Sequence, residues 1–141
     1  MEITIRDYKS TDYNDLMMLL KKVYDSTIDQ ITLEEKYITD HRGIMVAVTS
    51  DNVLVGSAFT EIQQDYVRTR RIIYVTYVAV DENYRKHGIG RKLFETIEDL
   101  CHKTHSSAVE FTSADYRIGA HEFYEKLGYA KKKTTHFIKE I

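Results

Sequence analysis

The stretch 85–90, Arg-Lys-His-Gly-Ile-Gly, has residue types that suit phosphate binding. It stands between the apolar run 71–80 and an amphipathic segment, so a helix is expected to begin here. The first backbone N–H groups of a helix have no intrahelical acceptor and carry the positive end of its dipole, so they can bind phosphate oxygens. Glycine leaves no Cβ atom between backbone and ligand. With the cationic side chains of Arg85, Lys86 and Arg91 close by, the spacing predicts an anion-binding turn.

A glycine bend without any ligand is the alternative interpretation of this turn. The dinucleotide-binding fingerprint needs a third glycine, and Leu93 stands at that position. The nucleotide P-loop needs a Gly-Lys-Ser/Thr sequence, which does not follow. Taken alone, the turn therefore indicates either a tight bend or a phosphate site of another kind.

A second segment that could carry chemistry lies at 120–129. Its apolar residues recur at helical spacing and predict a helix that ends near Gly128. The stripe consists of Ala120, Phe123, Tyr124 and Leu127. A tyrosine on such a stripe is commonly a core residue whose hydroxyl has a hydrogen-bond partner. Tyr124 becomes of interest because its helix is expected to pack beside the glycine turn.

Hydrophobic periodicity places the elements that must position these residues. The expected order is strand 3–7, helices 13–24 and 32–39, strands 44–48, 53–62 and 71–80, helix 89–101, strand 108–112, helix 120–127, and two short strands within 129–141. Thr32 and Glu35 form a capping-box pattern at the second helix. The run 71–80 is apolar on both faces, which predicts a central strand covered on both sides. The sequence thus predicts a mixed α/β fold with a mostly antiparallel sheet, helices on both faces and a cleft beside 78–80.

Together the two segments resemble the GNAT superfamily of N-acetyltransferases. The pattern Arg/Gln-x-x-Gly-x-Gly/Ala of that family, after a central strand, is matched by Arg85, Gly88 and Gly90. Its later Phe-Tyr-x-x-x-Gly-Phe/Tyr pattern is matched by Phe123, Tyr124, Gly128 and Tyr129. The expected element order matches over nearly the whole chain. The stretch from Ile44 onward is most similar to the aminoalkylphosphonate N-acetyltransferase branch, through Ala120-His121, Phe123-Tyr124 and Phe137-x-Lys139.

The resemblance implies that acetyl-CoA is the co-substrate and that Tyr124 is the general acid that protonates the departing thiolate. Transfer from a phenol near pKa 10 to a thiol near 8.5 is a modest uphill step. The residues expected to bind acetyl-CoA are Val78, Ala79 and Val80 along the pantetheine arm, and Arg85, Lys86, His87, Gly88, Ile89, Gly90 and Arg91 around the pyrophosphate. The residues expected beside the acceptor amine are Tyr24, Tyr74, Thr76 and Tyr77.

The general base is left open. Many relatives carry a carboxylate on the central strand, whereas no Asp or Glu lies between Arg70 and Val80 here. A chain of water molecules to Glu61, Asp115 or a histidine is the remaining route.

Composition narrows the function classes. The 141-residue chain is 43% hydrophobic and 30% charged with a net charge of −2, which is typical of one soluble cytoplasmic domain and unlike a nucleic-acid-binding protein. No apolar run has the length of a membrane span, and the N-terminus lacks a signal-peptide core. The single cysteine, Cys101, excludes an internal disulfide and is expected to be inert core. The histidines lack metal-ligand spacing, so no metal is expected, while a homodimer is left open.

Three functions remain. The favoured one is acetylation of the primary amine of a small metabolite, such as an amino acid or aminoalkylphosphonate. The alternatives are a protein lysine or N-terminal acetyltransferase and a non-catalytic CoA-binding regulatory module. Tyr124 argues against the module, since a sensor needs no acid. Without a carboxylate on the central strand, we expect acceptors of low amine pKa bearing an anionic group, with candidate cationic partners Arg68, Arg70 or Arg117.

Overall fold

Five strands form one sheet in the order β1-β2-β3-β4-β5. They are β1 (Ile3–Asp7), β2 (Arg42–Thr49), β3 (Leu54–Asp65), β4 (Arg70–Val80) and β5 (Ala108–Glu110). All neighbours pair antiparallel except β4 and β5, which are parallel. This computed structural model describes residues 1–141 as two compact units, 1–111 and 112–141, and the sheet belongs to the first. The predicted mostly antiparallel sheet is confirmed.

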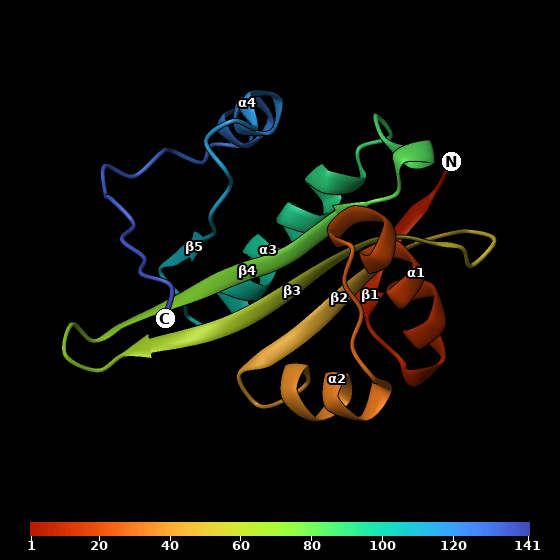
Figure 1. Cartoon of the computed structure of the whole chain (residues 1–141), viewed down its shortest axis with the longest axis horizontal. Coiled ribbons are helices and arrows are strands. Elements are labelled where there is room, and N and C mark those ends of the chain that lie inside the picture. Colours follow the sequence, from red (N-terminus) through yellow and green to blue (C-terminus); the bar gives the residue numbers. More distant parts are fainter. The chain divides into compact units, whose positions relative to one another are not determined.

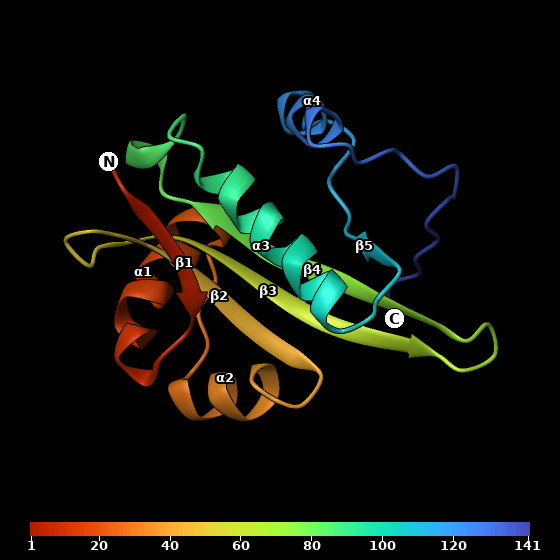
Figure 2. The same ribbon diagram turned by 180° about the vertical axis from the view of Figure 1, so that it is seen from behind.

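Helices cover both faces of this sheet. Helices α1 (Tyr13–Tyr24) and α2 (Gln30–Tyr37) lie on one face, in front of the strands in Figure 1. Helix α3 (Ile89–Lys103) lies along the other face, which Figure 2 shows from behind. A strand alternates its side chains between the two faces, so each strand contributes to two separate cores. The predicted layer arrangement is confirmed for this unit.

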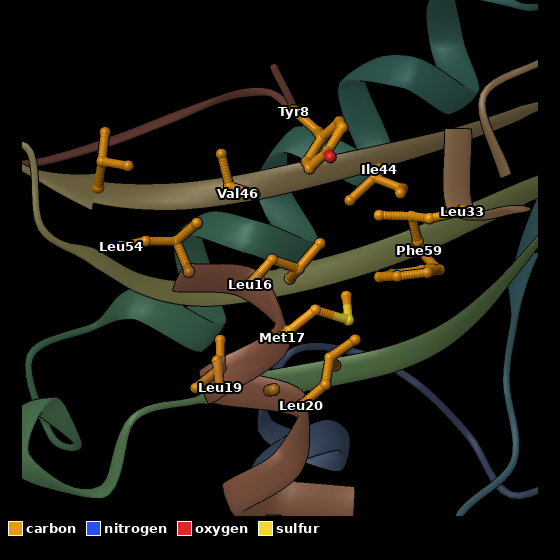
Figure 3. Packing of buried hydrophobic residues seen from close by; sticks show 12 residues of the cluster. Tyr8, Leu16, Met17, Leu19, Leu20, Leu33, Ile44, Val46, Leu54 and Phe59 are labelled. Atoms are coloured by element: carbon orange, nitrogen blue, oxygen red, sulfur yellow. The ribbon is translucent and has the colours of Figure 1, made fainter. Parts of the chain in front are cut away.

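The core beneath α1 and α2 joins elements distant in the sequence (Figure 3). Leu16 of α1 and Leu33 of α2 are fully buried, and both belong to one cluster with Phe59 of β3. The helices supply their apolar stripes and the strands supply every second residue. Burying a side chain of this size contributes about 1.5–3 kcal/mol before the entropy cost of ordering it.

The core beneath α3 has apolar side chains from α3 and β4 at its centre. Leu93, Phe94 and Ile97 of α3 are fully buried, and Ile73 and Val75 of β4 are buried on the facing strand. These helix positions have the spacing of one helical face, as the sequence predicts. The α3 core therefore fixes one side of β4 firmly.

Two local predictions in this unit are wrong. Helix α2 begins at Gln30 rather than near Thr32, because the carboxylate of Asp29 accepts the Thr32 backbone N–H at 2.9 Å and acts as the N-cap. Strand β4 is not covered on both faces, since Thr76 and Tyr77 are exposed.

The second unit, 112–141, contains helix α4 (Ile118–Lys126). Gly128 follows it with φ of +98°, a conformation that favours glycine, so the predicted helix end is confirmed. No strand follows, and the predicted final pair within 129–141 is wrong. The physical reason is that a short ribbon carrying the Lys131-Lys132-Lys133 run is marginal in water without further strands to pair with.

Candidate functional site

Strand β4 carries a bulge near its carboxyl end. Its partners on β3 run Thr76↔Phe59 and then Ala79↔Ser57, so Tyr77 and Val78 together oppose a single β3 residue. Tyr77 adopts φ of +49°, an uncommon value for a residue with a side chain. A bulge of this kind bends the strand and redirects a side chain. The consecutive residues Thr76 and Tyr77 are both exposed as a result.

Aromatic rings gather beside the bulge. The Tyr77 ring meets Tyr24 of α1 edge-on at 5.2 Å and Phe59 of β3 at 5.2 Å, measured between ring centroids. Tyr37 of α2 continues the cluster with a centroid 5.3 Å from that of Phe59. Of the residues predicted near the acceptor, the structure brings Tyr24 and Tyr77 into contact, with Thr76 on the neighbouring row.

The bulged end of β4 also has an open edge within this unit. Pairing with β5 covers only Ile72 to Tyr74, while β4 continues to Val80. The backbone N–H of Asp81 donates to the Val55 carbonyl at 2.8 Å, so alternation turns the backbone groups of Ala79 towards β3 as well. The Val78 N–H and the N–H and C=O groups of Val80 then face the open edge, while the Val78 carbonyl accepts a hydrogen bond from the Tyr24 hydroxyl. An extended ligand could add to this edge as a strand does.

Gly56 of β3 lies beneath the place where β4 leads into the glycine turn. A Cβ atom at Gly56 would lie 3.1 Å from Ile89 Cγ2 and 3.2 Å from both Ala47 Cβ and the Ala79 carbonyl oxygen. There is no room for a side chain, because one of these atoms belongs to the backbone. Gly56 therefore permits close packing of β3, β4 and the start of α3.

The glycine turn has the backbone shape of an anion site. After a short 3₁₀ turn (Glu82–Tyr84), Lys86 has φ of +67° and Gly88 has φ of +76°, and Gly88 is the N-cap of α3. An added Cβ at Gly88 would meet nothing within 4 Å, so this face of the turn is open. Left-handed residues at a helix start direct successive N–H groups into one concavity.

Three cationic side chains lie at the same turn, and no carboxylate forms an ion pair with them. Arg85, Lys86 and Arg91 are exposed and none forms an ion pair. His87 and Gly88 are exposed too, whereas the side chain of Ile89 is buried and leaves only its backbone for binding. The turn therefore combines backbone N–H groups, a glycine opening and three free cations, a donor set suited to a phosphate group.

Tyr124 belongs to the second unit and is half-buried on α4. Burial raises the pKa of its phenol, while the positive charge of Arg117 opposes that shift. A phenol is protonated at neutral pH even without this shift, so Tyr124 is in the state that a general acid requires, and burial makes its proton harder to transfer.

The possible bases are scattered. Glu61 of β3 is half-exposed and lies 3.5 Å from Arg42 Nε, in register with Tyr74 of β4. Asp115 belongs to the other unit. No group of histidine, cysteine and carboxylate side chains is arranged to hold a metal ion. No helix combines the length and hydrophobicity needed to cross a bilayer.

Sequence reasoning missed Ser57, which is fully buried on β3. Its hydroxyl donates to the Tyr77 carbonyl at 3.1 Å, on the bulge itself. It also missed the bond from the Tyr24 hydroxyl to the Val78 carbonyl, at 2.6 Å. Neither contact leaves a local sequence signal, because each depends on strand register or helix docking.

Comparison with known proteins gives a family and a fold. The model of the acetyltransferase (GNAT) family matches residues 6–129. A similar solved structure is an aminoglycoside acetyltransferase from an uncultured soil metagenomic sample in complex with trehalose, with 21% identity, 99% of this chain and 96% of that chain covered, and a TM-score of 0.86. Glucosamine-6-phosphate N-acetyltransferase from Arabidopsis thaliana has 18% identity, 99% coverage of both chains and a TM-score of 0.84.

A third structure, AAC(6')-Iy in complex with the bisubstrate analogue CoA-S-monomethyl-acetylneamine, has 17% identity, covers 100% of this chain and 99% of that chain, and has a TM-score of 0.87. At these identities the likeness shows a common fold. The family match spans the bulged strand, the glycine turn and α4.

Proposed function

The chain belongs to the acetyltransferase (GNAT) family and is an acetyl-CoA-dependent N-acetyltransferase, and on that premise we propose that it acetylates the primary amine of a small metabolite by direct attack in a ternary complex. The observation that carries the proposal is the bulged end of β4. It combines an open strand edge, a basic glycine turn directly after it and an aromatic cluster on the face opposite α3.

The residues of this end divide between the two substrates. The N–H groups of 85–91 and the side chains of Arg85, Lys86 and Arg91 would hold the pyrophosphate. The backbone of Val80 would pair with the pantetheine arm and the Val78 N–H would face its thioester end, while Ala79 faces β3 and supports the strand from the core. Bound acetyl-CoA supplies the acetyl group as a thioester, at the open edge.

In the proposed reaction a neutral amine forms a bond to the acetyl carbon, and the bond from that carbon to sulfur breaks. The aromatic cluster beside the bulge would exclude water and orient the amine. We assign Tyr124 the role of giving its proton to the departing sulfur, on the strength of its place in the family motif and its protonated state. The amine loses its extra proton to solvent or to a carboxylate reached through water, with Glu61 the candidate on the same sheet face as Thr76.

Tyr124→Phe tests the acid. The ring and its packing are kept while the transferable proton is lost, so turnover should fall by about 10²–10⁴ with acetyl-CoA affinity nearly intact. Steady-state kinetics and calorimetry measure the two effects. A fall of less than about threefold would mean that another group protonates the thiolate or that chemistry is not rate-limiting.

The acceptor itself is the finer part of the proposal. The similar structures carry the names of acetyltransferases for an aminoglycoside and for glucosamine 6-phosphate, which favours a small amine over a protein. The resemblance to the aminoalkylphosphonate branch would add an anionic group. The guanidinium of Arg70 lies 3.9 Å from the Glu110 carboxylate and donates a hydrogen bond to the Ser107 hydroxyl. Arg68 lies in the turn that joins β3 to β4, at the other end of these strands from the bulge.

A comparison of acceptors tests this proposal. The values of kcat/KM for an amino acid, an aminoalkylphosphonate, an aminoglycoside and a lysine-containing peptide should be measured across the neutral pH range. We expect a small amine to be preferred over the peptide by tenfold or more. The reverse preference would assign the chain to protein acetylation.

A further inference from the structure

Two side-chain hydroxyl groups hold consecutive carbonyls of the β4 bulge. The hydroxyl of Ser57, from β3, donates to the Tyr77 carbonyl at 3.1 Å. The hydroxyl of Tyr24, from α1, donates to the Val78 carbonyl at 2.6 Å. The two donors come from different elements, so β3 and α1 each hold one of the two peptide groups that flank Val78.

Because the peptide bond is planar, these two contacts also fix the directions of the neighbouring N–H groups. In a trans peptide the C=O of one residue and the N–H of the next point in opposite directions. The bond from Ser57 fixes the Tyr77 carbonyl towards β3, so the Val78 N–H points to the opposite, open edge. The bond from Tyr24 fixes the Val78 carbonyl, so the Ala79 N–H is directed back towards β3.

Ser57 is buried, so its hydroxyl depends on the Tyr77 carbonyl as its hydrogen-bond partner. Its side chain is fully buried, in a row where its cross-strand partner is Ala79. A buried polar group without a partner costs about 1–3 kcal/mol, so the bond satisfies both the Ser57 hydroxyl and the Tyr77 carbonyl. The Tyr77 carbonyl lies on a residue with a left-handed backbone, which holds strain that the surroundings must stabilise.

We propose that Ser57 and Tyr24 are positioning residues that hold the Val78 N–H at the open edge, ready to donate to the carbonyl oxygen of the thioester. Negative charge develops on that oxygen when the amine attacks, and a fixed N–H stabilises it without reorganisation. This inference rests on the proposed function. It also changes the part given to Tyr24, because its hydroxyl acts on the backbone of β4 rather than on the acceptor amine.

Matched controls for both residues exist in the same structural elements. Tyr13 of α1 also donates its hydroxyl to a backbone carbonyl at 2.6 Å, but that carbonyl belongs to Ile28, away from β4. Thr60 of β3 is buried and donates to the Gly43 carbonyl at 3.4 Å, on the opposite neighbour strand. Tyr13→Phe and Thr60→Val therefore remove comparable bonds without touching the bulge.

The experiment compares Tyr24→Phe and Ser57→Ala with these controls. In thermal unfolding, Tyr24→Phe should lose about as much stability as its control Tyr13→Phe, and Ser57→Ala about as much as Thr60→Val. Turnover with acetyl-CoA should fall about tenfold or more in Tyr24→Phe and Ser57→Ala and less than about twofold in the controls, since small displacements of catalytic groups are costly. The effect should appear mainly in kcat. The double variant should lose less than the product of the single effects, because both residues hold one structural element.

A readout independent of activity completes the test. Amide hydrogen exchange at Val78 should change in Tyr24→Phe and Ser57→Ala and stay unchanged in both controls. If Tyr24→Phe and Tyr13→Phe alter turnover and Val78 exchange equally, the positioning role is overturned. If the wild type binds acetyl-CoA and acetylates no small amine, the proposed function fails, while the exchange result still decides the role of these two hydroxyls.

Discussion

The two faces of the sheet differ in how completely they are covered. On the α3 face, Leu93, Phe94 and Ile97 of α3 are fully buried, and so is Ile73 of β4. On the α1 and α2 face, the core is equally tight around Leu16 but stops short of the bulge, where Thr76 and Tyr77 are exposed. The comparison indicates that one face holds the strand in place while the other leaves part of it accessible to solvent.

The largest expected effect concerns the closed face, the face of the sheet that α3 covers. Phe94→Ala removes a fully buried ring whose centroid lies 5.2 Å from that of Phe111, and should lower the free energy of unfolding by about 3–5 kcal/mol. Urea denaturation followed by circular dichroism measures the loss. A change below about 1 kcal/mol would mean that the α3 face is not the rigid support that the comparison requires.

The next effect depends on pH and lies on the α1 face. Arg6 donates two hydrogen bonds to the Asp12 carboxylate, at 2.8 and 2.9 Å, and holds the pKa of that carboxyl below its usual range. A group with a depressed folded-state pKa stabilises the protein above its unfolded-state pKa, and this contribution is lost as the pH falls through the folded-state value. Asp12→Asn should therefore cost about 1.5–3 kcal/mol at pH 7.

The same pair predicts the shape of the pH dependence. The difference in unfolding free energy between wild type and Asp12→Asn should shrink as the pH falls into the acid range below the ordinary pKa of an aspartate, since wild-type Asp12 becomes protonated only there. Urea denaturation at a series of pH values gives the curve. A constant difference across that range would contradict the depressed pKa of Asp12.

A smaller effect is expected where the closed face supports the site. In Gly56→Ala the new methyl group would crowd Ile89, Ala47 and the Ala79 carbonyl at 3.1–3.2 Å, which should cost about 1–3 kcal/mol. Because β4 and the start of α3 must shift, acetyl-CoA affinity should fall as well, as calorimetry can show. Gly43→Ala is the control, since the nearest atom to its added Cβ would lie at an ordinary 3.6 Å.

The smallest stability effect is expected on the α1 and α2 face, where β4 is exposed at the bulge. Thr76→Val replaces an exposed hydroxyl with a methyl group of similar size, so the unfolding free energy should change by less than about 0.5 kcal/mol. The value of kcat/KM for the acceptor should nevertheless fall, since Thr76 lies beside the bulge. A large stability loss without any kinetic effect would reverse the assignment of the two faces.

The sequence by itself determined the features that depend on near neighbours. The stripe of α3, the glycine turn at 85–90 and the end of α4 at Gly128 follow from spacing and from glycine conformation within one segment. The family motifs fall on those same segments, and from them the sequence predicts an acetyl-CoA site at the glycine turn and a general-acid role for Tyr124, which stay predictions. The hairpin of β2 and β3 was equally predictable, since a polar turn at 50–52 separates two apolar runs.

The tertiary structure alone decided how β4 is held and exposed. Nothing near Tyr77 predicts a left-handed backbone there, because aromatic residues locally favour extended strands. The bulge exists through the register with β3, and the bonds of Ser57 and Tyr24 join residues 20 and 54 positions apart. The predicted final pair of strands within 129–141 is wrong for a related reason, since a strand forms only where a partner strand pairs with it and none does so there. Spacing along the chain thus specifies which groups are available, and only long-range packing specifies where a backbone N–H points.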